Sequence, residues 1–169
     1  MSERTPAPGG LVLIQSLVNT LDIESGADAL DTVEGRALFG LDGLDESGAE
    51  RARELRESLR VVCLAHAGHP AHRDVRLLDE LLASAPLVVT VAAADGSAAF
   101  RPADPADLAS RVASAVAEAL TAGTWLRLKA CEASDCHWVY YDRSPAGRGR
   151  WCSMSSCGAR AKMRRYRSK

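Results

Sequence analysis

Apolar residues recur along the first half of the chain with the spacing of amphipathic helices. Residues 11–21 are apolar apart from a few polar positions, and we expect a helix there. Asp45 and Ser47 are both able to cap a second helix, which Gly68 and the proline after it would end. The apolar positions of this second helix are Ala52, Leu55, Leu59, Val62 and Cys63.

The pattern changes after residue 72 and then returns to helical spacing. Residues 73–84 predict a helix that ends before a proline. Residues 87–92 are rich in β-branched side chains, Asp95-Gly96 is a tight-turn pair, and residues 98–100 are placed to form a partner strand. A last helix should begin with Pro105 in its first turn and end near residue 123. The pattern thus predicts a mainly α domain with a small β-hairpin.

Length and composition allow one ordinary core and a small additional module. The chain has 169 residues, of which 47% are hydrophobic. Its longest apolar runs, such as residues 87–94, fall well short of the roughly 20 residues that span a bilayer. Residues 1–10 carry one basic residue, and the apolar stretch after them is too short for a secretory signal. We therefore expect no membrane association and a cytoplasmic location.

The net charge of −1 hides a division along the chain. From Arg127 onward there are 11 Lys or Arg against 3 Asp or Glu, whereas residues 1–126 hold 10 basic and 19 acidic residues. Such asymmetry predicts a basic segment with a polyanionic partner and an acidic segment with another task. A solvated charged tail is the alternative.

Four of the five cysteines are grouped as two C-x4-C pairs. They are Cys131, Cys136, Cys152 and Cys157, with fifteen residues between the pairs. Thiolates at such spacing surround a tetrahedral zinc ion, and four of them leave no open position, so we predict one structural zinc. Disulfides and a redox-active or iron–sulfur arrangement are the alternatives. His137 is placed to replace one cysteine, but four sulfurs already suffice.

The residues around the cysteines predict a small zinc-stabilised hairpin and helix module. Residues 138–141 are strongly β-forming, residues 144–149 read as a turn, and Arg150-Trp151 would return as the partner strand. About 40 residues cannot supply an adequate core, so the metal must contribute much of the folding free energy. We place the helical domain at residues 10–124 and the zinc module at residues 125–169.

The segment after Cys157 predicts a helix with two faces. One stripe is apolar and is expected to pack on the module, namely Ala159, Met163 and Tyr166. The neighbouring stripe is basic and is expected to reach outward, namely Arg160, Arg164 and Arg167. The planar fork of arginine suits phosphate groups and guanine edges. The candidates for DNA contact are Arg148, Arg150, Arg160, Lys162, Arg164, Arg165 and Arg167.

Residues 125–166 resemble the CGNR zinc-finger family of bacterial proteins. The pattern of that family is C-x4-C, an aromatic strand, D-x-S, and then R-x-W-C followed by C-G-N-R-x-K, with variable spacing before the tryptophan, and Ala159 stands here in place of the signature Asn. The matching residues are Cys131, Cys136, Asp142, Ser144, Arg150, Trp151, Cys152, Ser153, Met154, Cys157, Gly158, Arg160 and Lys162.

The N-terminal part is similar to the ABATE domain that usually precedes this finger. Val18-Asn19-Thr20 match the end of its recurrent D-F-V-N-T, whereas Ser16 and Leu17 stand where Asp and Phe are usual. The resemblance implies a stress-induced transcription regulator, in which the finger binds DNA and the helical domain senses a ligand.

Several other residues have both a functional and a structural interpretation. Asn19 and Thr20 are candidates for binding a small-molecule effector, or else they satisfy buried backbone groups. The aromatic residues 138–141 are able to stack on bases, but in so small a module they more often form core. A second set of metal-binding residue types recurs every three positions, and we interpret it as a buried cysteine with surface histidines: Cys63, His66, His69 and His72.

The sequence therefore predicts a two-part transcription regulator that binds DNA through a four-cysteine finger and senses an effector through its helical domain. Two other classes stay open, a zinc-dependent protein-interaction module and a thiol redox sensor. No Ser/His/Asp arrangement, phosphate loop or carboxylate pair stands out, and we do not expect an enzyme.

Overall fold

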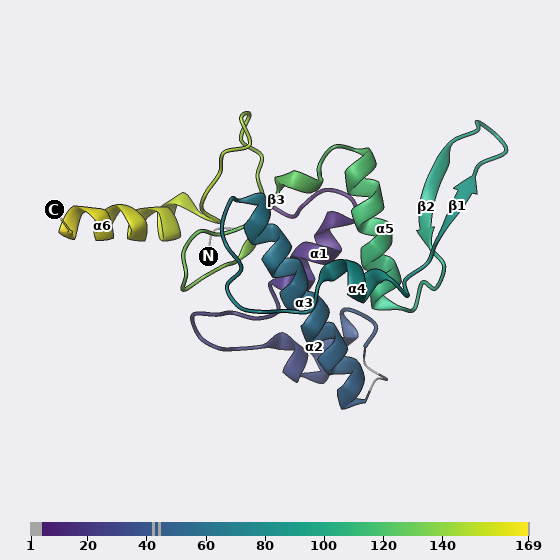
Figure 1. The fold of residues 1–169 in the computed structure, drawn as a ribbon, viewed down its shortest axis with the longest axis horizontal. Helices are drawn as coiled ribbons and strands as arrows, with labels where there is room; N and C mark the ends of the chain where they lie inside the picture. Colours follow the sequence, from purple (N-terminus) through teal and green to yellow (C-terminus); the bar gives the residue numbers. More distant parts are fainter. Residues whose placement is uncertain (1–4, 42, 44, 169) are drawn as a thin grey trace.

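The computed structural model describes residues 5–41, 43 and 45–168 (Figure 1). In this part of the chain, helices surround a central core and two small antiparallel sheets are added to them, which confirms the predicted mainly α class. No helix in the described ranges is long and apolar enough to cross a membrane. The elements are α1 (Leu11–Val18), η1 (Ala29–Asp31), α2 (Val33–Ala37), α3 (Glu46–His66), α4 (Leu78–Leu82), β1 (Leu87–Val91), β2 (Ala98–Pro102), α5 (Leu108–Thr121), η2 (Trp125–Arg127), β3 (Leu128–Ala130), β4 (Val139–Tyr141), η3 (Met154–Gly158) and α6 (Ala159–Arg167).

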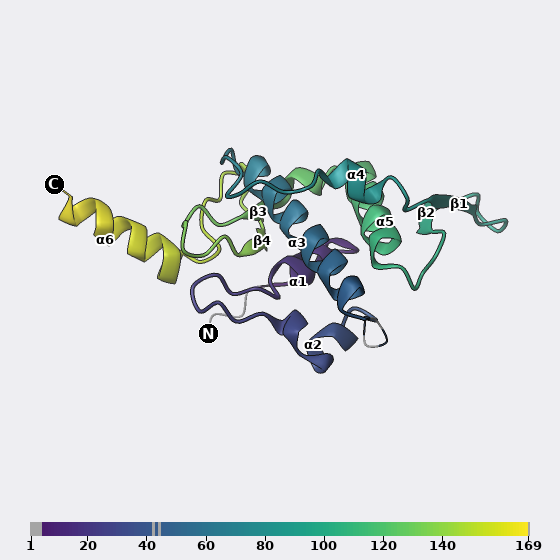
Figure 2. The same cartoon turned by 60° about the horizontal axis from the view of Figure 1, so that its bottom comes forward.

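The core is built around α1, which packs against both α3 and α5 (Figures 1 and 2). The first helix is apolar on nearly every side, and Ile14 and Leu17 are completely buried. Leu59 of α3 and Val112 of α5 are equally buried and close the core from the two neighbouring helices. A short apolar helix at the centre explains why residues 11–21 lack a clear polar face.

The longest helix, α3, begins and ends as the sequence predicts. The Asp45 carboxylate accepts a hydrogen bond of 3.0 Å from the Gly48 amide, which satisfies one of the free N–H groups of the first turn. At the other end Gly68 adopts a φ of +78°, the left-handed conformation that glycine tolerates best, and it terminates the helix.

The predicted helix over residues 73–84 is too long, because α4 spans only Leu78–Leu82. The preceding segment is tied to α3 instead of forming a turn of helix. His72 Nε2 lies 3.1 Å and Arg73 Nη2 lies 3.6 Å from the buried Glu57 carboxylate of α3. The hydrogen bond of His72 and the ion pair of Arg73 tie the start of this segment to the long helix.

The predicted first hairpin is present, but its turn is longer than Asp95-Gly96 alone. Strands β1 and β2 pair in antiparallel register, with Val89 opposite Phe100. The last ladder bond runs from the Ala92 amide to the Ser97 carbonyl, and Gly96, with a φ of +71°, donates its amide back to Ala92. The connection is therefore a four-residue loop closed by glycine. Helix α5 then begins at Leu108 rather than near Pro105.

The second sheet corrects the predicted hairpin of the zinc module. Strand β4 pairs with β3, with Lys129 opposite Tyr140, and not with residues 150–151. The hairpin thus encloses the first cysteine pair instead of connecting the two pairs. Leu128 and Val139 are completely buried in the same core as the helices, so apolar burial on α3 outweighs the local strand-turn pattern at residues 144–149.

Candidate metal centre and nucleic-acid interface

The β3–β4 connection, the loop before η3 and η3 itself bring the cysteine sulfurs of the two C-x4-C pairs together. Their Sγ atoms all lie within 4.8 Å of one another, and both Cys136–Cys152 and Cys152–Cys157 are 3.7 Å apart. None of the cysteines forms a disulfide. Cys131 and Cys157 are buried, while Cys136 and Cys152 are partly exposed.

The spacing of these sulfurs fits a tetrahedral zinc ion. Zinc–sulfur bonds of about 2.3 Å place the corners of a tetrahedron about 3.8 Å apart, which agrees with the Cys136–Cys152 and Cys152–Cys157 distances. Hydrogen bonding from the Cys136 and Cys152 thiols lowers the pKa of Cys131 to about 4, whereas the hydrogen bond with Cys131 raises the pKa of Cys152. Four thiols this close together cannot all lose their protons unless a cation is present, and a divalent cation stabilises the four thiolates. The cluster is a structural zinc site.

His137 is not placed as a zinc ligand. It has a φ of 45°, the left-handed conformation, at the point where the chain turns from Cys136 into β4. Its Nδ1 lies 3.1 Å from the carbonyl oxygen of Cys131, and its amide bonds to the Ala133 carbonyl. The histidine therefore closes the turn that carries the first cysteine pair, and four sulfurs hold the ion.

A buried aspartate organises the loop that carries the chain to the second cysteine pair. Asp142 is 3% exposed and accepts hydrogen bonds from the Ser144 amide at 3.0 Å, the Gly149 amide at 2.7 Å and Lys129 Nζ at 3.0 Å. Lys129 Nζ also donates to the Gly147 carbonyl. A Cβ on Gly149 would lie 2.9 Å from the Asp142 carboxyl carbon, so only glycine fits beside it. This role of Asp142 depends on burial and distant partners, which its local sequence does not reveal.

Replacing this aspartate should destabilise the module. Burial raises the pKa of Asp142, but the bonds from Ser144, Lys129 and Gly149 outweigh it and lower the pKa to about 2. The carboxylate therefore stabilises the fold fully above its ordinary pKa of 3.8, and this contribution is lost as the pH falls through about 2. At neutral pH we expect Asp142→Asn to cost about 2 kcal/mol of unfolding free energy.

Denaturant unfolding of the zinc-loaded chain near pH 7 measures this cost. Asp135→Asn is a matched control, because Asp135 is 41% exposed and makes only longer ion pairs. Equal unfolding free energies for the two variants would contradict the role given to Asp142.

The helical domain holds the finger through backbone hydrogen bonds. The Asn19 side chain donates to the Val139 carbonyl at 2.8 Å and accepts from the Val139 amide at 2.7 Å. His66 Nδ1 lies 2.8 Å from the Leu128 carbonyl oxygen. Thr20 Oγ1 donates to the Leu17 carbonyl at 2.8 Å. Asn19 and Thr20 therefore satisfy backbone groups, which was the structural alternative for these two residues. Their role in binding an effector stays a prediction.

A buried ionic network on α3 supports the same junction and was not foreseen from the sequence. Arg60 is completely buried, and its guanidinium bonds to Glu57 at 3.1 Å, to the Val18 carbonyl at 2.8 Å and to the His137 carbonyl at 3.1 Å. Arg56 closes the network by donating to Glu57 at 2.8 Å. The only sequence signal was an Arg–Glu pair at helical spacing beside the apolar stripe.

The residues considered for a second metal site do not form one. Among the described residues, the four finger cysteines are the one group of metal-binding side chains that come together. Burial raises the pKa of Cys63 to about 12, so this sulfur stays a thiol. His66 and His72 have hydrogen-bonding neighbours at Leu128 and Glu57, respectively.

The aromatic residues of the finger divide between core and surface. Tyr140 is 8% exposed, so its ring is part of the module's interior. Tyr141 is partly buried, with the Arg143 guanidinium 5.1 Å from its ring centroid. Trp138 lines a groove described below. The core interpretation therefore holds best for Tyr140.

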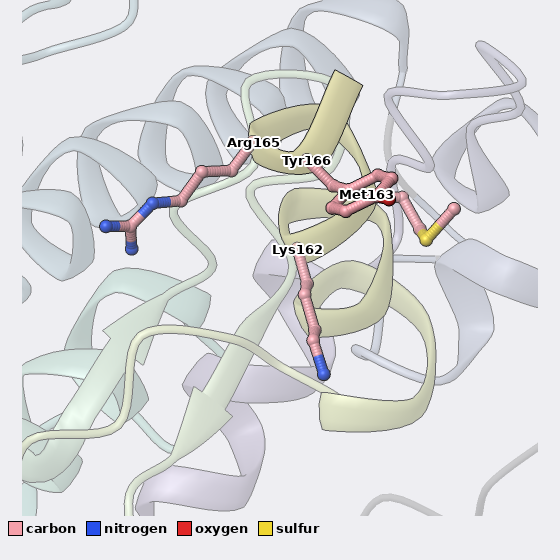
Figure 3. Close-up of a pocket in the computed structure, with 4 residues that line it drawn as sticks. All are labelled: Lys162, Met163, Arg165 and Tyr166. Atoms are coloured by element: carbon pink, nitrogen blue, oxygen red, sulfur yellow. The ribbon is translucent and has the colours of Figure 1, made fainter. Parts of the chain in front are cut away.

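Helix α6 starts directly after the last zinc ligand and projects from the body of the molecule (Figures 1 and 2). None of its residues is buried. The prediction that an apolar stripe packs on the module is wrong, because Met163 is 51% and Tyr166 is 77% exposed. These two side chains line a shallow surface together with Lys162 and Arg165 (Figure 3).

The stripe predicted to reach outward instead faces the protein in part. Arg160 Nη1 lies 2.7 Å from Glu24 of the helical domain and 3.8 Å from Asp135, and Nη2 donates to the Cys157 sulfur at 3.3 Å. Arg164 lies 3.6 Å from the same Asp135. These contacts neutralise two of the candidate arginines. They also stabilise the Cys157 thiolate from outside the first coordination shell.

The remaining basic candidates also divide into residues that are paired with a carboxylate and residues that are not. Arg150 forms a bidentate ion pair with Glu132, and its guanidinium lies 5.4 Å from the Trp151 ring centroid. Within the described part of the chain, four exposed candidates have no acidic side chain within ion-pair distance: Arg148, Lys162, Arg165 and Arg167. Lys169 lies outside the described residues.

A groove of about 1200 Å³ separates α6 from the loop after α1. Asp22 and Glu24 form its acidic wall, and Arg164 and Arg167 lie on its basic wall. The acidic half of the chain thus covers one side of the basic helix, while the side carrying Lys162 and Arg165 stays open (Figure 3).

A four-thiolate site that precedes a basic helix and is docked on a helical domain defines a zinc-finger protein whose finger is joined to a helical domain. Comparison with protein families shows which zinc-finger family is involved. Residues 127–169 match the CGNR zinc finger, and residues 11–123 match the ABATE family, described as "Putative stress-induced transcription regulator". The chain belongs to this family and carries its zinc finger. No curated protein matches the chain.

Proposed function

We propose that this chain is a non-catalytic transcription regulator that binds duplex DNA with helix α6. The observation that carries the proposal is the helix itself, which has five Lys or Arg among nine residues, no acidic residue and no buried side chain. A cationic helix of this kind fits the major groove of DNA and contacts phosphates along its rim. Because Cys157 immediately precedes it, the zinc ion fixes the direction in which it projects.

The contacts within the protein divide the basic residues of α6 into two groups. Lys162 and Arg165 on the open side, and Arg167 on the groove wall, have no ion pair among the described residues and are available to phosphates, whereas Arg160 and Arg164 are already paired with carboxylates. Binding through the first group needs no internal ion pair to break. The proposed interface therefore differs from the face expected from the sequence, although it uses the same helix.

Binding to labelled duplex, followed by fluorescence anisotropy with the zinc-loaded full chain, tests this function. Between about 50 and about 200 mM salt, three phosphate contacts should give a slope of log K against log salt of about −3. Unlabelled duplex should displace the label, and polyglutamate at equal charge should not. Absence of binding at the lower salt, or equal displacement by both competitors, would reject DNA as the partner.

A second candidate function, protein interaction, is favoured by the exposed apolar pair on α6. Met163 and Tyr166 border a surface hollow of about 380 Å³ that is almost entirely apolar (Figure 3). Aromatic residues and methionine are enriched in protein interfaces. Displacement of DNA by polyglutamate in the anisotropy experiment would favour this reading.

Effector sensing by the helical domain belongs to the same proposal. A cavity of about 550 Å³ lies between α3, α4 and the segment before α5, within the size range of small-molecule sites. Arg51 and Arg76 supply positive charge there, and Glu54 and Asp104 supply negative charge. A polar, zwitterionic compound would fit this lining better than an apolar one.

A further inference from the structure

The hairpin formed by β1 and β2 projects from the end of the molecule opposite α6 (Figures 1 and 2). Strand β2 is fastened to α5. Ser114 of α5 donates to the Phe100 carbonyl at 3.1 Å, and Arg101 lies 3.5 Å from Glu118 of the same helix. A two-stranded hairpin is marginally stable in water unless something packs on it. Its uncovered surfaces therefore need an explanation.

One face of this hairpin is entirely apolar. The register places cross-strand partners on the same face, so one face carries Leu87, Val89, Val91, Ala98, Phe100 and Pro102. Val89 is 64% and Val91 is 65% exposed. The opposite face carries the polar and charged members, Thr90 and Arg101. The side chains that should be buried are thus the ones in water.

The outer edge of β1 also presents unpaired backbone groups. The Ala92 amide bonds to Ser97 and the Pro86 carbonyl accepts from Ala103, so even-numbered residues of this strand bond toward β2. Because the direction alternates, Leu87, Val89 and Val91 point their N–H and C=O groups away from β2. In Figure 1, β2 lies on the α5 side and β1 on the outer side. The same three residues supply the apolar face and the free edge.

This edge has none of the features that usually block strand pairing. No charge, proline or glycine lies within Leu87–Val91, whereas β2 ends in Arg101-Pro102. The other sheet has no comparable edge, because Val139 is buried and its backbone is bonded to Asn19. Free backbone groups of an extended strand are satisfied best by another strand. Within the described residues the other two strands, β3 and β4, pair with each other, so a partner strand for β1 would have to come from another chain.

We propose that β1 pairs with β1 of a second copy of this chain, in antiparallel register about a twofold axis at Val89. In this register Val89 bonds with Val89 of the second copy, and Leu87 bonds with Val91, giving about six interchain hydrogen bonds. Every pair on the apolar face is then aliphatic, and Val88 meets Thr90 on the other. An uncharged β-branched strand is complementary to itself, so the contact closes as a dimer.

The size of the contact sets its strength. One five-residue strand covers less than the roughly 800 Å² per partner of a stable interface, so the dimer should form at micromolar concentrations and dissociate on dilution. The dimer would place the two α6 helices at its far ends, since hairpin and α6 lie at opposite ends of each chain (Figure 1).

Sedimentation of the zinc-loaded full chain from about 1 to about 300 µM tests the proposal. The average mass should rise from that of one chain toward that of two. Val89→Lys should keep one chain throughout, because two like charges meet at the axis. Thr90→Lys adds the same charge to the same exposed strand, away from the axis, and should dimerise as the unmodified chain does. A monomeric unmodified chain at every concentration, or equal dimerisation of both variants, overturns it.

Amide hydrogen exchange gives an independent readout of the edge. The amides of Leu87, Val89 and Val91 should gain at least tenfold protection as the concentration rises, because they become bonded only between chains. The amides of Val88 and Thr90 already bond toward β2 and should change little. A dimer without this alternating protection would be formed by another surface and would overturn the proposal.

Discussion

Purified protein should contain one zinc ion per chain, and the double variant Cys152→Ser, Cys157→Ser should contain none. All four sulfurs lie within 4.8 Å of one another, so removing two leaves too few ligands for a closed site. Structural zinc contributes on the order of 10 kcal/mol to such modules, so the variant should lose order from residue 142 to α6. Metal analysis and hydrogen exchange measure the two effects.

The effect should be confined to part of the finger. Leu128 and Val139 belong to the main core and should keep slow exchange, as should α1 and α3. Cys63→Ala is the control, because this cysteine is completely buried and lies outside the sulfur cluster, and it should retain the zinc. A stoichiometric zinc content in the double variant would contradict the assignment of the site.

The second large effect concerns DNA binding. Replacing Lys162, Arg165 and Arg167 together with Ala should lower the salt slope by about three units and weaken binding on the order of 100-fold near 0.1 M salt. All three are exposed and have no internal ion pair among the described residues. The loss should be similar for every duplex sequence, since phosphate contacts carry no sequence information.

A comparison of two adjacent arginines makes this prediction specific. Arg164 is paired with Asp135 at 3.6 Å, whereas Arg165 is free on the open side of α6 (Figure 3). Arg165→Ala should therefore reduce affinity and slope more than Arg164→Ala, although both remove the same charge. Equal losses would show that the internal ion pair does not decide which side of the helix binds. Zinc content should be unchanged in both.

Local signals in the sequence predicted the parts of the fold that depend on local interactions. The Asp45 cap and the glycine after α3 bound the longest helix correctly, because caps act on neighbouring backbone groups. The four cysteines identified the metal site, since the spacing of C-x4-C pairs is itself the signal. The family resemblance was confirmed over both parts of the chain.

The errors arose where distant contacts override a local pattern. The strand at Val139–Tyr141 pairs with Leu128–Ala130 because both bury apolar side chains on α3, a contact that no turn signal reveals. On α6, helical spacing distinguished an apolar from a basic stripe, but only the positions of Glu24 and Asp135 decide which stripe faces the protein. Arg60 was overlooked because a buried charge is visible only through its partners.

The contact between Asn19 and Val139 affects whether the zinc finger can be moved to another protein. A finger moved to another protein would carry Leu128 and Val139 into water and leave the Val139 carbonyl without its donor and the Val139 amide without its acceptor. The helical domain left behind would keep a buried Arg60 that has lost the His137 carbonyl. Zinc fingers in tandem arrays can be exchanged one by one. Here the finger and the helical domain satisfy each other's buried groups, so the two have to be transferred together.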